Sequence, residues 1–228
     1  MLGLQGPSTE RNTSLKLSDI AYQRFKESLF SHRLALGAVV SQAELVALLD
    51  VPLTPLRDAV HRLHAEGLVE VMPRSGIRIL KPDMELIRHT YQLRTMLERE
   101  GIRRLAEVCA AAEVGDWMER HSAVERALDA GMGHAEAAAL AQEVDDAFHH
   151  AVIGSLKNPI IDEVYRQTRD RVALIRLDRS YVLSPPLIRA TMQEHRAILD
   201  ALADNDRDAA ALAMDAHLTH SMHRAMGF

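Results

Sequence analysis

The sequence has 228 residues and a single cysteine, Cys109, so no disulfide can form within one chain. It also lacks an apolar run near the ~20 residues that a membrane-spanning helix requires. No basic stretch followed by a hydrophobic one occurs near the N-terminus, so we expect no signal peptide. These absences argue against secreted disulfide-rich proteins and membrane proteins. They predict a protein of the reducing cytoplasm with no membrane partner.

Aromatic residues are scarce as well, at 4% of the sequence, although hydrophobic residues in total make up 47%. This combination predicts cores packed mainly from the aliphatic side chains of helices. The sequence contains no glycine-rich phosphate loop and no Gly-x-Ser-x-Gly nucleophile motif, which argues against two common classes of enzyme. The length allows one large domain or two ordinary ones.

The clearest local signals lie in residues 41–80 and predict two short helices separated by a tight turn. Ser41 is a good N-cap for the first helix, and Glu44 three residues later completes a capping box. Thr54 is expected to cap the second helix, with Pro55 at its first position, where a missing N–H costs nothing. The two helices together have the length and spacing of a helix-turn-helix.

Gly67 is expected to end the second helix, and the residues after it predict a β-hairpin with strands at 68–71 and 77–80. Such a unit suits DNA because a helix fits the major groove, with its N-terminal residues at the base edges. The candidate contacts are Thr54 and Arg57 in the second helix, and Arg74 and Arg78 in the hairpin. These signals alone leave a second interpretation open, a small α/β domain with solvated arginines.

The same segment resembles the winged helix-turn-helix of GntR-family transcription regulators. The residues that carry the resemblance are Thr54-Pro55-Leu56-Arg57-Asp58-Ala59, then Leu63-His64-Ala65-Glu66-Gly67-Leu68-Val69, then Arg74-Ser75-Gly76. The resemblance implies sequence-specific binding to double-stranded DNA and adds Ser75 and Gly76 of the wing to the candidate contacts. Two departures leave the DNA sequence preference open. The family's Ser-Arg pair before Thr-Pro is Pro52-Leu53 here, and its Gly is Asp50.

The rest of the chain predicts a short N-terminal extension and a helical second domain. Residues 1–17 predict a mobile tail, and Ser18 is expected to cap a helix that leads into a winged helix-turn-helix domain over 18–80. Lys81-Pro82-Asp83 marks the domain boundary, because Pro stops a strand and Asp can cap the next helix. Residues 81–228 predict an antiparallel bundle of six helices, at about 84–111, 114–130, 134–155, 159–178, 186–203 and 206–226. The predicted fold class is therefore mainly α.

The charge distribution bears on how such a protein binds DNA. The whole chain has a formal net charge of −5, but residues 1–80 carry 9 basic and 8 acidic side chains, a net charge of +1. A single copy of that domain should bind DNA weakly, because phosphate contacts supply most of the affinity. We therefore expect a homodimer that binds two half-sites of a palindromic operator.

The predicted bundle contains one set of residues that suits a metal ion. Asp145 and His149 lie four residues apart, so they share a face of one helix, and His195 and His217 lie on two later helices. One carboxylate and three imidazoles suit a divalent transition metal and leave positions for water or a ligand. The chain has 12 histidines, however, so the same set is also consistent with histidines that make ordinary hydrogen bonds.

The second domain also resembles the effector-binding FCD domain of the FadR subgroup of GntR regulators. Asp145, His149, His195 and His217 match the metal-ligand pattern of that domain in order and in context. The resemblance implies a metal, zinc in the first place and nickel, manganese or iron as alternatives. It also implies a small-molecule effector, for which we expect a carboxylate. Arg94 is the candidate to bind that carboxylate, with an ion pair inside the bundle as the alternative.

The function predicted from the sequence is therefore a metal- and effector-binding regulator rather than an enzyme. Two alternatives stay open at this point. A metal held by Asp and His can activate water, which would make the chain a hydrolytic enzyme. The bundle could instead recruit a protein partner, with structural histidines, which would make the chain a DNA-binding adaptor.

Overall fold

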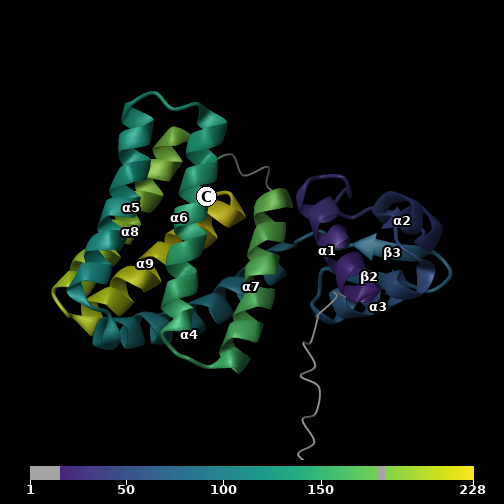
Figure 1. Cartoon of the computed structure of the whole chain (residues 1–228), viewed down its shortest axis with the longest axis horizontal. Helices are drawn as coiled ribbons and strands as arrows, with labels where there is room; N and C mark the ends of the chain where they lie inside the picture. The colour runs from purple at the N-terminus through teal and green to yellow at the C-terminus, as the bar shows by residue number, and fades with distance from the viewer. Residues whose placement is uncertain (1–15, 179–182) are drawn as a thin grey trace, which may run out of the picture. The chain divides into compact units, whose positions relative to one another are not determined.

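The computed structural model describes residues 16–178 and 183–228 (Figure 1). The predicted mobile tail falls largely on residues 1–15, which lie outside the described residues. The chain divides into two compact units, Met1–Leu80 and Lys81–Phe228. The described residues form nine α-helices and one three-stranded sheet, which confirms the mainly α fold class.

The first unit is a winged helix-turn-helix. Its three strands form an antiparallel sheet in the order β1-β3-β2, and its three helices pack together through the buried side chains of α1 and α3. The elements are α1 (Leu17–Phe30), β1 (Val39–Val40), α2 (Gln42–Leu49), α3 (Leu53–Ala65), β2 (Val69–Met72) and β3 (Gly76–Ile79).

The helix starts confirm two predicted caps, Ser41 and Asp83, and correct two others. Ser41 and Glu44 form the predicted capping box, with the Glu44 N–H donating to the Ser41 hydroxyl at 3.2 Å. Thr54 is not the cap of α3, because the helix already begins at Leu53 with Pro52 at the N-cap. The φ of Pro52, −64°, is fixed by its ring and directs the chain into the helix without a side-chain hydrogen bond. Ser18 likewise lies inside α1, which begins one residue earlier.

The wing contains a strand that the sequence did not predict. β1 has two residues, too few to show an alternating pattern, and it pairs with β3 through Val39 opposite Arg78 and Val40 opposite Ile77. The close approach of β1 explains Gly76. Its φ is +122°, and an added Cβ would lie 2.6 Å from the backbone oxygen of Val40.

The turn between α2 and α3 contains Asp50, in a left-handed backbone conformation. Asp50 has a φ of +50°, a conformation that disfavours most side chains but is tolerated by Asp. Arg24 of α1 donates from Nη1 to the backbone oxygens of Leu49 at 2.9 Å and Asp50 at 2.6 Å. These bonds satisfy carbonyl groups at the end of α2 and place a positive charge at its negative pole.

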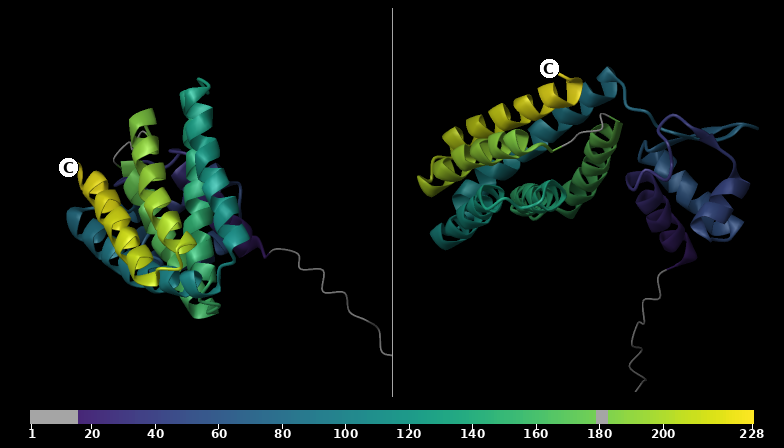
Figure 2. Two further views of the ribbon diagram at one scale, coloured as in Figure 1. Left: turned by 90° about the vertical axis from the view of Figure 1, so that its left-hand side faces the viewer. Right: turned by 90° about the horizontal axis from the view of Figure 1, so that it is seen from above.

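The second unit is a bundle of six helices, as predicted, and each helix end lies within three residues of its predicted position. The helix α9 packs along α4 and α8, while α6 packs on α4, α5, α7 and α8 (Figure 2). The helices are α4 (Met84–Val108), α5 (Ala111–Asp129), α6 (His134–Gly154), α7 (Pro159–Asp178), α8 (Pro185–Ala203) and α9 (Arg207–Met226). Among the described residues, no helix combines the length and the apolar character needed to cross a bilayer.

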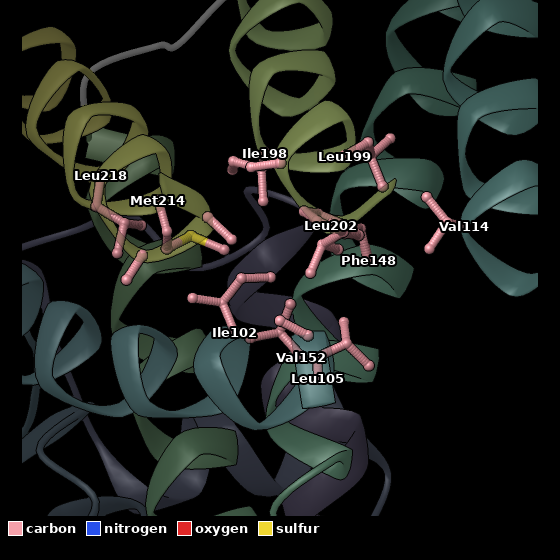
Figure 3. Packing of buried hydrophobic residues seen from close by; sticks show 14 residues of the cluster. Ile102, Leu105, Val114, Phe148, Val152, Ile198, Leu199, Leu202, Met214 and Leu218 are labelled. Carbon is pink, nitrogen blue, oxygen red and sulfur yellow. The ribbon is translucent and has the colours of Figure 1, made fainter. Parts of the chain in front are cut away.

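The largest hydrophobic cluster of the bundle joins five of its helices (Figure 3). Phe148 of α6 is fully buried there, and its ring centroid lies 5.1 Å from that of His195 and 5.8 Å from that of His149. The cluster is therefore continuous with a group of buried histidines. Its labelled members are Ile102, Leu105, Val114, Phe148, Val152, Ile198, Leu199, Leu202, Met214 and Leu218.

Replacing Gly101 with alanine is expected to lower the free energy of unfolding by about 1–3 kcal/mol. Gly101 is the point where α4 approaches α6, and an added Cβ would lie 2.7 Å from the backbone oxygen of Val152. The two helices would have to separate, and urea unfolding would measure the destabilisation. Gly115 in α5 is the matched control, because an added Cβ there would meet no described atom within 4 Å other than those of its chain neighbours and the adjoining backbone of its own helix. Alanine at that position should stabilise the helix by up to about 1 kcal/mol. Equal urea midpoints for the two variants would contradict this account of the α4–α6 packing.

Candidate metal centre

The bundle brings together the four residues that the sequence singled out as candidate metal ligands. Asp145 and His149 come from α6, His195 from α8 and His217 from α9, and all four side chains are buried. One ligand atom from each residue lies within 4.8 Å of the other three. Three helices that are separate in sequence therefore converge on one point.

The distances between these ligand atoms match the size of a transition-metal site. Nε2 of His217 lies 3.3 Å from Nε2 of His195 and 3.2 Å from Nε2 of His149. Oδ1 of Asp145 lies 3.6 Å from Nε2 of His149 and 3.5 Å from Nε2 of His195. Ligands placed about 2.0–2.2 Å from a zinc ion in a tetrahedron would be roughly 3.3–3.6 Å apart. Four of the six separations in the set therefore agree with those expected around a divalent cation.

Each histidine presents Nε2 to this centre and has a partner at Nδ1. Nδ1 of His149 lies 2.6 Å from a carboxylate oxygen of Glu98 on α4. Nδ1 of His217 lies 2.8 Å from a carboxylate oxygen of Glu194 on α8. The third partner, at 3.0 Å from Nδ1 of His195, is Nε2 of His121 on α5. Partners of this kind orient metal-binding imidazoles and select the tautomer whose Nε2 has a free lone pair.

The electrostatic environment keeps two of the imidazoles neutral. Burial lowers the pKa of His217 to about 4 and lowers the pKa of His195 well below its ordinary value. Both side chains are therefore neutral at pH 7 and able to bind a metal. Burial acts in the same direction on His149, but Glu98 and Asp145 together outweigh it and raise the pKa of that imidazole. Burial alone would raise the pKa of Asp145, but Arg176, His149 and His195 together outweigh burial and hold the pKa of this carboxyl well below its ordinary value.

Around the ligands, three carboxylates are matched by three guanidinium groups. The pairs are Asp145 with Arg176 at 3.2 Å, Glu98 with Arg94 at 2.5 Å and Glu194 with Arg224 at 2.7 Å. Their formal charges cancel, so a bound divalent cation would add two positive charges that nothing within these pairs offsets. An anionic ligand would offset them, since a buried excess charge is costly.

A small pocket lies beside the cluster. It has a volume of about 20 Å³, and its lining includes Asp145, His217, Arg176, Arg224 and Met192. That volume is enough for about one water molecule. A larger ligand would therefore have to move side chains, and Met192 is the lining residue best suited to adapt, since methionine has three rotatable side-chain bonds.

The structure places Arg94 next to the centre but in an ion pair. Its Nε donates to Oε1 of Glu98 at 2.5 Å, and its side chain is 5% exposed. The same carboxylate oxygen accepts the hydroxyl of Tyr165 at 2.8 Å. This is the bundle ion pair that the sequence left as the alternative for Arg94. The arginines that line the pocket are Arg176 and Arg224.

The candidate DNA contacts lie on α3 and on the wing. Thr54 and Arg57 are exposed on α3, and Nε of Arg57 donates to the side-chain oxygen of Gln42 on α2 at 3.0 Å. In the wing, Arg78 pairs with Glu70 at 3.1 Å. The turn before β3 holds the other three candidates, of which Arg74 and Ser75 are exposed and Gly76 is half-buried.

Several residues beside the candidate metal ligands and the candidate DNA contacts were not predicted from the sequence. Glu98, Glu194 and Arg176 contact the candidate ligands, and His121 contacts His195. His61 is exposed one turn after Arg57 on the same face of α3. The spacing of four residues from Arg57 could have identified His61 from the sequence. The other residues lie on helices far apart in sequence, and the spacing of residues along the chain does not show such contacts.

A winged helix-turn-helix followed by a helical bundle is an arrangement typical of DNA-binding regulators. Two family models match the chain accordingly. The FCD domain matches residues 89–220, and the model described as "Bacterial regulatory proteins, gntR family" matches residues 17–79. The chain therefore belongs to the GntR family of transcription regulators and carries an FCD domain.

Individual relatives agree with this assignment. The chain is 26% identical over 223 residues to the HTH-type transcriptional repressor RspR of Escherichia coli (strain K12), and the aligned region covers 92% of this chain and 89% of RspR. The structure of E. coli McbR/YncC aligns with a TM-score of 0.73 at 18% identity, over 94% of this chain and 99% of that one. The metal-free FCD domain of TM0439 aligns with a TM-score of 0.50 at 19% identity, over 64% of this chain and 95% of that domain. At these identities the structural matches show a shared fold.

Proposed function

We propose that this regulator belongs to the FadR subgroup and that its bundle binds a divalent transition metal and a small anionic effector. Effector binding changes the affinity of the winged helix for its operator. The observation that carries the proposal is the buried cluster of Asp145, His149, His195 and His217, whose ligand atoms all lie within 4.8 Å of one another. The protein acts in the cytoplasm, as a homodimer.

The winged helix supplies the DNA-reading surface. Thr54, Arg57 and His61 project from the exposed face of α3, which enters the major groove, and Arg74 and Arg78 of the wing bind the neighbouring backbone. Ser75 and Gly76 let the turn of the wing approach the DNA closely. Because residues 1–80 carry a net charge of only +1, two copies are needed for firm binding, and the operator is a palindrome.

The metal is held by Asp145 and the three imidazoles. Their nitrogen and oxygen donors suit zinc first, and nickel, manganese or iron second. When bound, such a cation supplies a fixed positive charge and a coordination position for an anionic oxygen. The chain's own residues do the rest. Glu98, His121 and Glu194 orient the imidazoles, and Arg176 neutralises Asp145.

The effector is a small carboxylate. The charge balance around the centre favours an anion, and the pocket beside Asp145 and His217 presents Arg176 and Arg224 to it. Arg94 is not among the residues that line the pocket, so it would have to exchange its contact with Glu98 for the effector. Since the pocket has a volume of only about 20 Å³, the effector must displace lining side chains of α6, α8 and α9. That rearrangement is how the bundle responds.

The proposal predicts that zinc-loaded protein binds small carboxylates and that this binding changes operator affinity by about 5- to 150-fold. A panel of mono- and dicarboxylates would be tested by calorimetry and by DNA-binding titration, with the corresponding uncharged amides as controls. Protein treated with a chelator should respond to neither group. Equal binding of acids and amides would contradict the assignment of an anionic effector.

The operator is best found by selecting fragments from a genomic DNA library at two salt concentrations, with zinc present. We expect one enriched palindrome and a steep fall in affinity with salt. No enrichment at either concentration would remove sequence-specific reading from the proposal.

Hydrolysis by the zinc-loaded protein would favour an enzyme instead. An adaptor is the better description if removing the metal changes neither effector nor DNA binding.

A further inference from the structure

His121 is a buried histidine on α5, outside the set of candidate ligands. Its side chain lies between the backbone of its own helix and His195 of α8, and it is 2% exposed. Nδ1 of His121 lies 2.6 Å from the backbone oxygen of Trp117, one turn earlier. Nε2 of His121 lies 3.0 Å from Nδ1 of His195. Both ring nitrogens therefore have one defined neighbour each.

These two neighbours determine where the hydrogens lie. A carbonyl oxygen can only accept a hydrogen bond, so Nδ1 of His121 must donate to Trp117. Neither a carbonyl nor an imidazole compensates a buried positive charge, so the ring of His121 is neutral and its Nε2 carries a lone pair. That lone pair must therefore accept a hydrogen bond from the Nδ1–H group of His195. The hydrogen of a neutral His195 then lies on Nδ1, and its Nε2 faces the centre unprotonated.

The other tautomer of His195 would have favourable contacts of its own. A hydrogen on Nε2 would lie between Oδ1 of Asp145 at 3.5 Å and Nε2 of His217 at 3.3 Å. That hydrogen would occupy the position from which Nε2 binds a metal. The acceptor at Nδ1 therefore decides whether His195 is ready for a metal or blocked by its own hydrogen.

We infer that His121 is a positioning residue that fixes His195 in the tautomer able to bind a metal through Nε2. It takes the place that Glu98 has beside His149 and Glu194 has beside His217, but it carries no charge. A carboxylate in the position of His121 would add a negative charge with no arginine partner to the three balanced ion pairs around the centre. A histidine anchored on a backbone carbonyl supplies the acceptor without the charge.

Aromatic packing holds the His121 ring in this position. Its centroid lies 5.5 Å from that of Phe148, with the rings nearly perpendicular at 88°, and 6.4 Å from that of Trp117. The ring of His195 lies 5.1 Å away and is inclined by 70°. Contacts on several sides restrict rotation of the His121 side chain, so the hydrogen-bonded geometry is maintained without metal.

Two substitutions separate the hydrogen-bond acceptor from the bulk of the ring. His121→Leu fills part of the space but accepts no hydrogen bond, whereas His121→Gln places an amide oxygen near the position of Nε2. We expect zinc affinity, measured by competition with a chelator, to fall about 10- to 100-fold in His121→Leu. In His121→Gln it should stay within about threefold of the unsubstituted protein, because an acceptor for His195 is restored. An equal fall in affinity in both variants would overturn the inference.

A second measurement does not depend on metal binding, although the inference rests on the proposed metal site. Long-range proton–nitrogen NMR of metal-free protein labelled at histidine nitrogens reports the tautomer of His195 directly. We expect the hydrogen on Nδ1 in the unsubstituted protein and in His121→Gln, and a shift of population toward Nε2–H in His121→Leu. Nε2–H in the unsubstituted protein would overturn the inference, even if His121→Leu fails to fold. Failure of the unsubstituted protein to bind zinc would overturn the proposed metal site, while the tautomer would still decide the role of His121.

Discussion

Replacing His195 with alanine is expected to weaken zinc binding by two to three orders of magnitude. A four-ligand zinc site contributes about 10–16 kcal/mol, so one ligand accounts for roughly 2.5–4 kcal/mol, which is on the order of 70- to 900-fold in affinity. His195 is fully buried, and its Nε2 lies 3.3 Å from that of His217 and 3.5 Å from Oδ1 of Asp145. Chelator competition followed by metal analysis would measure the change in affinity.

The same experiment has a matched control in the neighbouring histidine. His150 follows His149 on α6 but is exposed, because successive residues are rotated about 100° around a helix. His150→Ala should therefore bind zinc normally. Since His195→Ala also opens a cavity, Asp145→Asn serves as a second variant that removes a charged ligand at almost constant volume. Retention of zinc by both ligand variants would show that the cluster is not the metal site.

Metal binding should also appear as a gain in stability. A metal that binds only the folded protein stabilises it by about 2.7 kcal/mol when its free concentration is 100 times its Kd. We expect zinc to raise the midpoint of thermal unfolding of the unsubstituted protein and of His150→Ala, but to have little effect on His195→Ala. This readout needs no knowledge of the effector or the operator.

The candidate ligands could be predicted from the sequence because one local rule and one resemblance point to them. Asp145 and His149 share a helix face at a spacing of four, and the order of the later histidines matches a known domain. The side chains that contact the candidate ligands follow no such rule. Glu98 and His121 lie 51 and 74 residues from the histidines they contact, and their pairing depends on how the helices pack.

The fold, like the candidate ligands, could largely be predicted from the sequence. Helix positions follow from apolar periodicity and from breaks such as Asn158-Pro159, so all six bundle helices were predicted. The errors lie where local signals compete or are too short. Thr54 is a good capping residue, but the fixed φ of Pro52 starts α3 earlier. β1 is held by its pairing with β3, which a two-residue segment cannot reveal.

Replacing Arg57 with alanine is expected to weaken operator binding by at least about 30-fold. A hydrogen-bonded contact with a base edge contributes about 1–3 kcal/mol, and a dimer would lose two such contacts. Arg57 lies on the exposed face of α3, four residues after the helix begins. Its Nε is held by the side chain of Gln42 at 3.0 Å, which positions the guanidinium while its two terminal NH₂ groups keep four hydrogens for DNA. Titration of labelled operator DNA would measure the change in affinity.

The salt dependence of the same variant tells a base contact from a phosphate contact. If Arg57 reads a base, affinity should fall most for the preferred operator, and discrimination at one position of each half-site should relax while the salt slope stays nearly constant. If it binds phosphate, all sequences should weaken together, and the slope should decrease by about 0.9 for each phosphate that is no longer neutralised. Arg126→Ala is the control, because Arg126 is an exposed arginine of the bundle that pairs with Glu119. Full operator affinity in Arg57→Ala would remove this residue from the reading surface and leave Thr54 and His61 as the residues of α3 to test.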